Sequence, residues 1–237
     1  MATSGTTTYT VTRDDIIKRA LRLVGGLGQG ETPTAAQTSE AATALNMLVK
    51  HLANRGVLLW SRKEISITPV AGQEAYEIGP GKTINQDRPL KVYNIDRYNA
   101  TTGITVGLLP LSQADFSSVN VSNISSTPSQ YWVEPLRDST KIHFYPYPDT
   151  TFAANEVFVV YYQATMQDFS ASTDNPDVPQ EFFDLLCYGL ANRLSVEYGV
   201  ERFLRERIKQ DYQEILAEAL SFNEEDESLF FQPDRGM

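Results

Sequence analysis

The chain has 237 residues, of which 41% are hydrophobic and 11% aromatic, enough for one large core or two small ones. Its formal net charge of −10 argues against a surface whose main task is to grip nucleic acid, because neutralising phosphates requires an excess of Lys and Arg. The single cysteine, Cys187, excludes a disulfide within one chain and is expected to be a buried small hydrophobe.

The N-terminus has neither a basic start nor an apolar stretch, so it is not expected to be a signal peptide. No run of residues approaches the about 18 apolar residues of a membrane span. We therefore expect a soluble protein that is made in a reducing cytoplasm and does not contact a membrane.

Two helices are predicted before residue 57. Thr12 begins the first as an N-cap, and Asp15 three residues later makes this a variant of the capping box. The glycine-rich stretch 25–33 ends it. The second helix is expected to run from near Pro33 or Thr34 to Gly56 and to bury one apolar side, formed by Ala41, Leu45, Leu48, Val49 and Leu52.

From residue 62 the apolar residues alternate instead of following the helical period. The alternating stretches 64–68 and 75–78 flank a turn, which predicts a β-hairpin. Further short strands are expected around 92–98, 104–108, 131–133, 141–144 and 156–162, with a short helix at 112–116. This spacing favours an antiparallel sandwich or barrel. Residues 168–178 are expected to be a polar linker.

The strongest helical periodicity lies in residues 179–222. One apolar stripe contains Phe183, Leu186, Leu190 and Leu194, and after Gly199 a second stripe contains Leu204, Ile208, Tyr212, Ile215 and Ala219. Two amphipathic helices need an apolar partner, and the other strong helices lie at the opposite end of the chain. The two chain ends are therefore expected to close one helical bundle.

These observations predict an α+β fold. Residues 12–60 and 179–222 form a helical bundle domain, and residues 61–178 form an inserted antiparallel β-sandwich or barrel domain. Residues 1–11 and 223–237 are expected to be flexible arms.

No motif in the chain carries recognisable chemistry. Gly79–Thr83 ends like a phosphate-binding loop, but Tyr76 stands where that loop needs its first glycine, so a β-turn is expected. Two histidines and one cysteine offer no zinc spacing, and no G-x-S-x-G sequence occurs. No pair of carboxylates stands out. We predict that the chain is not an enzyme and has no catalytic residue, metal ligand or cofactor.

Two segments are candidates for contacts with other proteins. The last helix carries charges of both signs, including Arg202, Arg205, Glu206 and Lys209, which either face solvent or form salt bridges to a neighbouring copy. The tail after Phe222 has an acidic patch followed by the apolar cluster Leu229, Phe230 and Phe231. That cluster either folds back or docks into a partner.

The order and spacing of four pieces resemble a known family. They are ALNMLVKHLANRGVLLW at 44–60, EISITPVAGQEAYEIG at 64–79, IHFYPYPD at 142–149 and Pro-x-x-Phe from Pro179. Together they are similar to the head-to-tail adaptors of short-tailed bacteriophages, the family of tail tubular protein A and the packaged-DNA-stabilising tail accessory factor. The similarity covers nearly all of residues 12–222.

The resemblance implies a structural protein of the virion neck or tail that is present in the host cytoplasm during assembly. It implies a dodecameric ring under the portal protein, with a downstream tail, nozzle or fibre protein as further partner, and DNA passing through the channel without specific binding. Leu229, Phe230 and Phe231 are then expected to contact the portal, and Arg202, Arg205, Glu206 and Lys209 to form the ring contact. Two alternatives remain, a peptidoglycan hydrolase carried by the particle and a DNA-binding connector.

Overall fold

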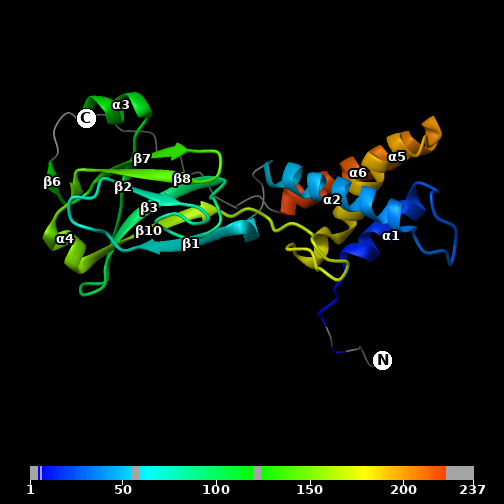
Figure 1. Ribbon diagram of the computed structural model, residues 1–237, viewed down its shortest axis with the longest axis horizontal. Coiled ribbons are helices and arrows are strands. Elements are labelled where there is room, and N and C mark those ends of the chain that lie inside the picture. Colours follow the sequence, from blue (N-terminus) through cyan, green and yellow to red (C-terminus); the bar gives the residue numbers. More distant parts are fainter. Residues whose placement is uncertain (1–4, 6, 55–58, 120–123, 223–237) are drawn as a thin grey trace, which may run out of the picture. The chain divides into compact units, whose positions relative to one another are not determined.

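The computed structural model describes residues 5, 7–54, 59–119 and 124–222. It has the predicted α+β class, with helices from both ends of the chain and antiparallel sheets from its middle (Figure 1). Of these residues, those up to 54 and from 167 onward group into one compact unit, the helical unit, and those from 59 to 166 into another, the β unit.

The helical unit is built around α5, which packs against each of its three main neighbours. Its buried side chains include all four members of the predicted stripe, Phe183, Leu186, Leu190 and Leu194. Gly199 has the positive φ of 58° expected of a residue that ends a helix. The elements of this unit are α1 (Arg13–Leu23), α2 (Ala35–Asn54), a 3-10 turn (Gln180–Phe182), α5 (Phe183–Glu197) and α6 (Arg202–Phe222).

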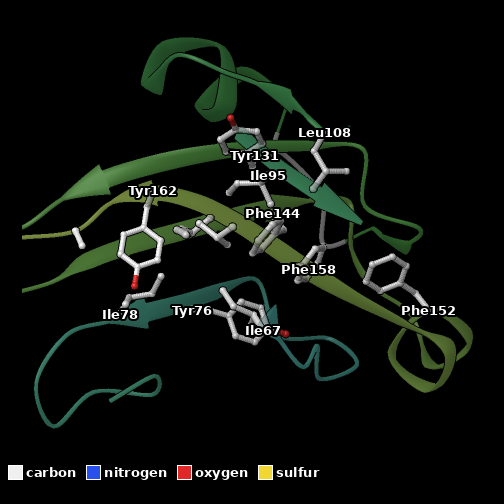
Figure 2. Packing of buried hydrophobic residues seen from close by; sticks show 13 residues of the cluster. Ile67, Tyr76, Ile78, Ile95, Leu108, Tyr131, Phe144, Phe152, Phe158 and Tyr162 are labelled. Carbon is white, nitrogen blue, oxygen red and sulfur yellow. The ribbon is translucent and has the colours of Figure 1, made fainter. Parts of the chain in front are cut away.

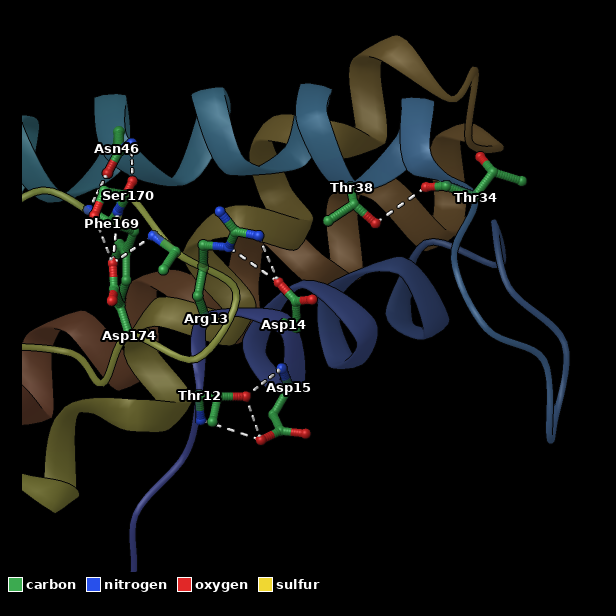
Figure 3. Close-up of polar contacts among 11 residues, drawn as sticks. Thr12, Arg13, Asp14, Asp15, Thr34, Thr38, Asn46, Phe169, Ser170 and Asp174 are labelled. Carbon is green, nitrogen blue, oxygen red and sulfur yellow. Dashed lines mark hydrogen bonds and ion pairs between the residues drawn. The ribbon is translucent and has the colours of Figure 1, made fainter.

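Side-chain caps fix where the first two helices begin. The Thr12 hydroxyl accepts from the Asp15 N–H at 3.3 Å and the Asp15 carboxylate accepts from the Thr12 N–H at 3.1 Å, which confirms the predicted capping box (Figure 3). The same reciprocal arrangement starts α2, where Thr34 and Gln37 bond each other's N–H groups at 3.3 and 2.9 Å. Each cap satisfies N–H groups that the helix itself leaves unpaired.

Gly189 lets α2, α5 and α6 approach closely. A Cβ atom added there would lie 2.9 Å from Leu48 Cδ2 and 3.0 Å from Tyr212 Cε2. Real Cβ atoms do not come this close to their neighbours, so the absence of a side chain at this position sets the spacing of the three helices. It also shows that Leu48, Gly189 and Tyr212 lie at one level of the bundle.

The segment 167–178 belongs to the helical unit, although its polar composition suggests a linker at the end of the β domain. The Asn46 side chain bonds Phe169 N at 2.9 Å and Phe169 O at 3.0 Å, and Arg13 N donates to Asp174 O at 2.8 Å (Figure 3). The Asp174 carboxylate closes the loop by accepting from Ser170 N and Ala171 N. These contacts tie the segment to α1 and α2, and composition alone does not show them.

The β unit contains two four-stranded sheets. The first has the order β1 (Arg62–Ile67), β10 (Glu156–Gln163), β3 (Lys91–Asn99) and β4 (Ile104–Gly107). The second has the order β2 (Ala75–Ile78), β8 (Thr140–Tyr145), β7 (Gln130–Pro135) and β5 (Leu109–Pro110). Shorter elements are a 3-10 turn (Leu59–Ser61), α3 (Gln113–Val119), β6 (Ser125–Ser126), β9 (Tyr147–Pro148) and α4 (Thr150–Asn155).

The predicted hairpin between 64–68 and 75–78 is wrong. Strand β1 pairs with β10 in the first sheet, and β2 pairs with β8 in the second. The turn between them, closed by Gln73 N donating to Val70 O at 3.0 Å, carries the chain from one sheet to the other. Both strands still point Ile67, Tyr76 and Ile78 into the common core, so their alternation was informative but their partners were not local.

Aromatic and aliphatic side chains fill the space between the two sheets (Figure 2). Phe144 of β8 stacks on Phe158 of β10 with ring centroids 3.8 Å apart, and Tyr76 of β2 meets both rings edge-on. Such rings bury large apolar areas in specific geometries. The packing of one sheet on the other is that of a sandwich, with most strand pairs antiparallel and the β5–β7 and β6–β9 pairs parallel.

Candidate interaction surface

A groove runs over the helical unit along α2, α5 and α6. One part is a hollow of about 490 Å³ lined by Ala44, Met47, Asn192, Arg193, Val196, Glu197, Arg205 and Lys209. The next part is a hollow of about 590 Å³ lined by Asn46, Met47, Lys50, His51, Asn54, Asp168 and Arg193. The two parts share Met47 and Arg193, so we treat them as one surface, the helical groove.

The middle of the helical groove is apolar and faces solvent. Met47 is 60% exposed and Val196 is 56% exposed. Each lies beside the buried stripe of its own helix, since Leu48 of α2 and Leu194 of α5 point inward. Apolar side chains that gather in a hollow and are rimmed by polar groups mark interaction sites more often than single exposed ones do.

The rim of the helical groove is mainly cationic, although the chain as a whole is acidic. Lys50, Arg193, Arg205 and Lys209 line it together with only two carboxylates, Asp168 and Glu197. Lys50 pairs with Asp168 at 2.7 Å. In the part of the chain that the structure describes, the side chains of the other three cations make no ion pair. The groove is therefore suited to a ligand that is both apolar and acidic.

A histidine between two carboxylates is the clearest cluster of titratable groups in the β unit. His143 of β8 lies with Nδ1 2.9 Å from Glu74 Oε1 and Nε2 3.2 Å from Glu134 Oε2. Its ring stacks on Trp132 at 4.6 Å, and the side chain is almost wholly buried. Both ring nitrogens are thus occupied by carboxylates, and the Tyr147 hydroxyl donates to the second oxygen of Glu74 at 3.2 Å. We interpret it as a satisfied buried histidine.

The other groups that the sequence singled out are structural. Lys82 N donates to Gly79 O at 3.1 Å, which confirms the β-turn expected at 79–83. Cys187 is buried as predicted, and burial raises the pKa of its thiol to about 11. No group of His, Cys, Asp and Glu within the described residues is arranged to hold a metal ion. Nor does any helix of that part combine the length and apolar character needed to cross a membrane.

Comparison with known families indicates which class of protein this surface belongs to. A model of the SU10 adaptor protein matches residues 8–235, which is nearly the whole chain. The chain belongs to the SU10 adaptor protein family. A comparison with curated proteins finds no match.

Membership of the SU10 adaptor family confirms the coarser part of the resemblance: the protein is a structural adaptor of a bacteriophage, which implies general contacts with portal and tail proteins at the virion neck. An adaptor role agrees with the prediction that the chain is not an enzyme. The tail tubular protein A type, the short tail and the ring remain predictions.

The structure separates the four residues predicted at the ring contact of this SU10 adaptor family member. Arg205 and Lys209 line the helical groove. Arg202 and Glu206 instead pair with each other at 2.9 Å on the exposed face of α6. Phe203, the residue after Arg202, is 77% exposed. The predicted portal contacts Leu229, Phe230 and Phe231 lie outside the described residues.

Sequence reasoning missed the apolar members of the surface. Met47 and Val196 are the off-stripe apolar residues of two amphipathic helices, and this position was the available signal. Phe203 is also an apolar residue outside the buried stripe of its helix, and it was missed as well. Leu204, which was expected in the buried stripe of α6, remains 39% exposed, while Ile208 and Leu216 are buried.

Proposed function

We propose that this protein forms a ring between the portal and the tail of its virion, around the channel through which DNA leaves. The observation that carries the proposal is the match of the SU10 adaptor family to residues 8–235. The net charge of −10 supports it, because a channel wall that repels phosphate lets DNA slide without sticking. A dodecameric ring, as in the adaptors that the sequence resembles, is the expected assembly.

The start of α6 is proposed as the contact between neighbouring copies in the ring. Phe203 projects into solvent beside the ion pair that Arg202 and Glu206 form along the helix. An exposed aromatic ring among charges of both signs suits a partner of the same composition, and another copy of this chain offers one. The cluster Leu229–Phe231 is proposed to reach the portal, and the opposite side of the ring to meet a downstream tail, nozzle or fibre protein.

Electron microscopy of the protein alone and mixed with its portal tests this proposal. We expect single copies without the portal and closed rings with twelvefold symmetry on it, and Phe203→Ser should weaken ring closure without unfolding the protein. Failure of the purified protein to join the portal would contradict the adaptor placement. DNA filter binding and a cell-wall digestion assay test the two alternatives. The particle-borne hydrolase would require activity that Glu74→Gln or Glu134→Gln abolishes.

A further inference from the structure

The helical groove has the opposite chemistry to the chain segment that follows α6. The groove offers exposed Met47 and Val196 among Arg193, Arg205 and Lys209. Residues 224–231 read Glu-Glu-Asp-Glu-Ser-Leu-Phe-Phe, four acids followed by three large apolar residues with one serine between. A segment that is both acidic and apolar is the kind of ligand that this surface fits.

The C-terminus of α6, at Phe222, lies on the same side of the bundle as the part of the groove that Asn54 lines. Leu48 and Tyr212 lie at one level, next to Gly189. On one side of that level lie Ala44, Asn192 and Lys209, which line the same hollow; α2 and α6 reach them toward their N-termini and α5 toward its C-terminus. In the other direction, α2 therefore leads to Asn54 and α6 to Phe222.

The length of chain after Phe222 is sufficient to return to the groove. The ten residues from Tyr212 to Phe222 rise about 15 Å along the helix. Val196 lies seven residues beyond Gly189 on α5, about 10 Å further. The seven residues from Phe222 to Leu229 span about 23 Å when extended, and the eight to Phe230 about 26 Å. The order of residues also fits, because the acids would pass Lys50 and His51 at the near end before Leu229 and Phe230 reach Met47 and Val196.

We propose that in the free protein residues 224–231 fold back and occupy the helical groove of their own chain. This arrangement removes apolar side chains of both partners from water and pairs acids with the groove's cations. The binding does not depend on the proposed function. If the protein does join a portal through Leu229–Phe231, the portal must first displace the segment from the groove, and docking then exposes Met47 and Val196.

Disulfide trapping in the full-length protein tests the proposal. Val196→Cys is combined with Phe230→Cys, and the reference protein combines Phe203→Cys with Phe230→Cys. Cys187 takes little part because it is buried and the pKa of its thiol is raised to about 11. A bond needs Cα atoms within about 7 Å. We expect the groove pair to form an intrachain bond roughly tenfold faster than the reference pair, since a docked segment has a higher effective concentration.

Three controls make the result decisive. Arg193→Glu with Lys209→Glu should slow trapping of the groove pair, and added salt should slow it as well. Circular dichroism checks that each variant is folded, and Met47→Cys replaces Val196→Cys if that variant is not. Equal rates for the groove and reference pairs would overturn the proposal, as would bonds that join two chains. A protein that traps normally but does not join the portal would contradict only the proposed function.

Discussion

The two units of this protein differ in the partners that their Lys and Arg side chains contact. In the β unit, two of the cations meet partners from the same unit: Arg62 lies 4.8 Å from the centre of the Tyr93 ring beside a hollow of about 550 Å³, and Arg97 pairs with Glu156 at 3.3 Å. In the helical unit, Arg193, Arg205 and Lys209 surround apolar side chains in the helical groove without such partners among the described residues.

The contrast shows which exposed charged groups have partners within their own unit and which do not. The β unit also exposes apolar residues, but Ile104 and Val106 lie along the edge strand β4, and Arg97, the residue opposite Val106, is paired with Glu156. Cations around an apolar hollow are a more specific arrangement, since they select the sign of charge of whatever binds. The helical unit is therefore where a partner's chemistry can be inferred.

The largest expected effect comes from emptying the centre of the β unit. Phe158→Ala removes a ring that stacks on Phe144 and contacts Tyr76 and Phe152, and should cost about 3–5 kcal/mol. Both tryptophans, Trp60 and Trp132, belong to the β unit, so urea unfolding followed by tryptophan fluorescence reports this loss.

Tyr161→Ala, on the same strand but partly exposed, is the matched control and should cost much less. Circular dichroism at the helix band then compares the two units in the same sample. Equal losses for Phe158→Ala and Tyr161→Ala would contradict the assignment of Phe158 to the core.

A smaller loss is expected when the close approach of α2, α5 and α6 is blocked. Gly189→Leu introduces a strong helix former, so any loss of stability comes from the contacts with Leu48 and Tyr212 and not from helix propensity. Overpacking of this kind costs about 1–3 kcal/mol. Thermal unfolding followed by helical circular dichroism measures it. Gln213→Leu on the exposed side of α6 is the control, and a similar shift there would point to a general effect of added leucine.

The loop that joins the segment 167–178 to α1 should make the helical unit sensitive to acid. Hydrogen bonds from the Ala171 and Ser170 N–H groups lower the pKa of Asp174 from its ordinary value of 3.8. The charged form therefore stabilises the folded state above that value, and this contribution is lost as the pH falls through the lower pKa of the folded state.

Asp174→Asn should accordingly destabilise the helical unit at neutral pH and flatten the loss of stability between neutral and acidic pH. Helical circular dichroism over a pH series of urea titrations measures both changes. Asp177→Asn, three residues away on an exposed position, is the control variant. An unchanged slope in Asp174→Asn would show that the loop does not contribute in this way.

The comparison of the units also explains what could be predicted from the sequence. The helices and most strands followed from local patterns, and the capping box of Thr12 and Asp15 was found because both partners lie within one turn. The pairing of β1 with β10 joins residues nearly a hundred positions apart, and alternation does not identify such a partner. The hairpin prediction failed for that reason.

The interaction surface was predicted only through its charges. Arg205 and Lys209 were found because charged residues crowd the sequence of α6. Met47 and Val196 were missed because single exposed apolar residues are common on any surface, and only the fold shows that they share one hollow. Sequence patterns thus describe each helix, whereas the groove depends on how three helices meet.

The smallest effect on stability, and the sharpest test of the contrast, comes from adding a negative charge to each unit. Val196 in the helical groove is 56% exposed and Ile104 on β4 is 58% exposed, so Val196→Glu and Ile104→Glu should each change stability by no more than about 0.5 kcal/mol. If residues 224–231 occupy the groove, Val196→Glu alone repels them. Chymotrypsin should then cleave after Phe230 and Phe231 faster in Val196→Glu than in Ile104→Glu or the unchanged protein, as measured by mass spectrometry. Equal cleavage in all three proteins would mean that the apolar hollow and its cations do not hold the acidic segment, and that the two units do not differ in the way proposed.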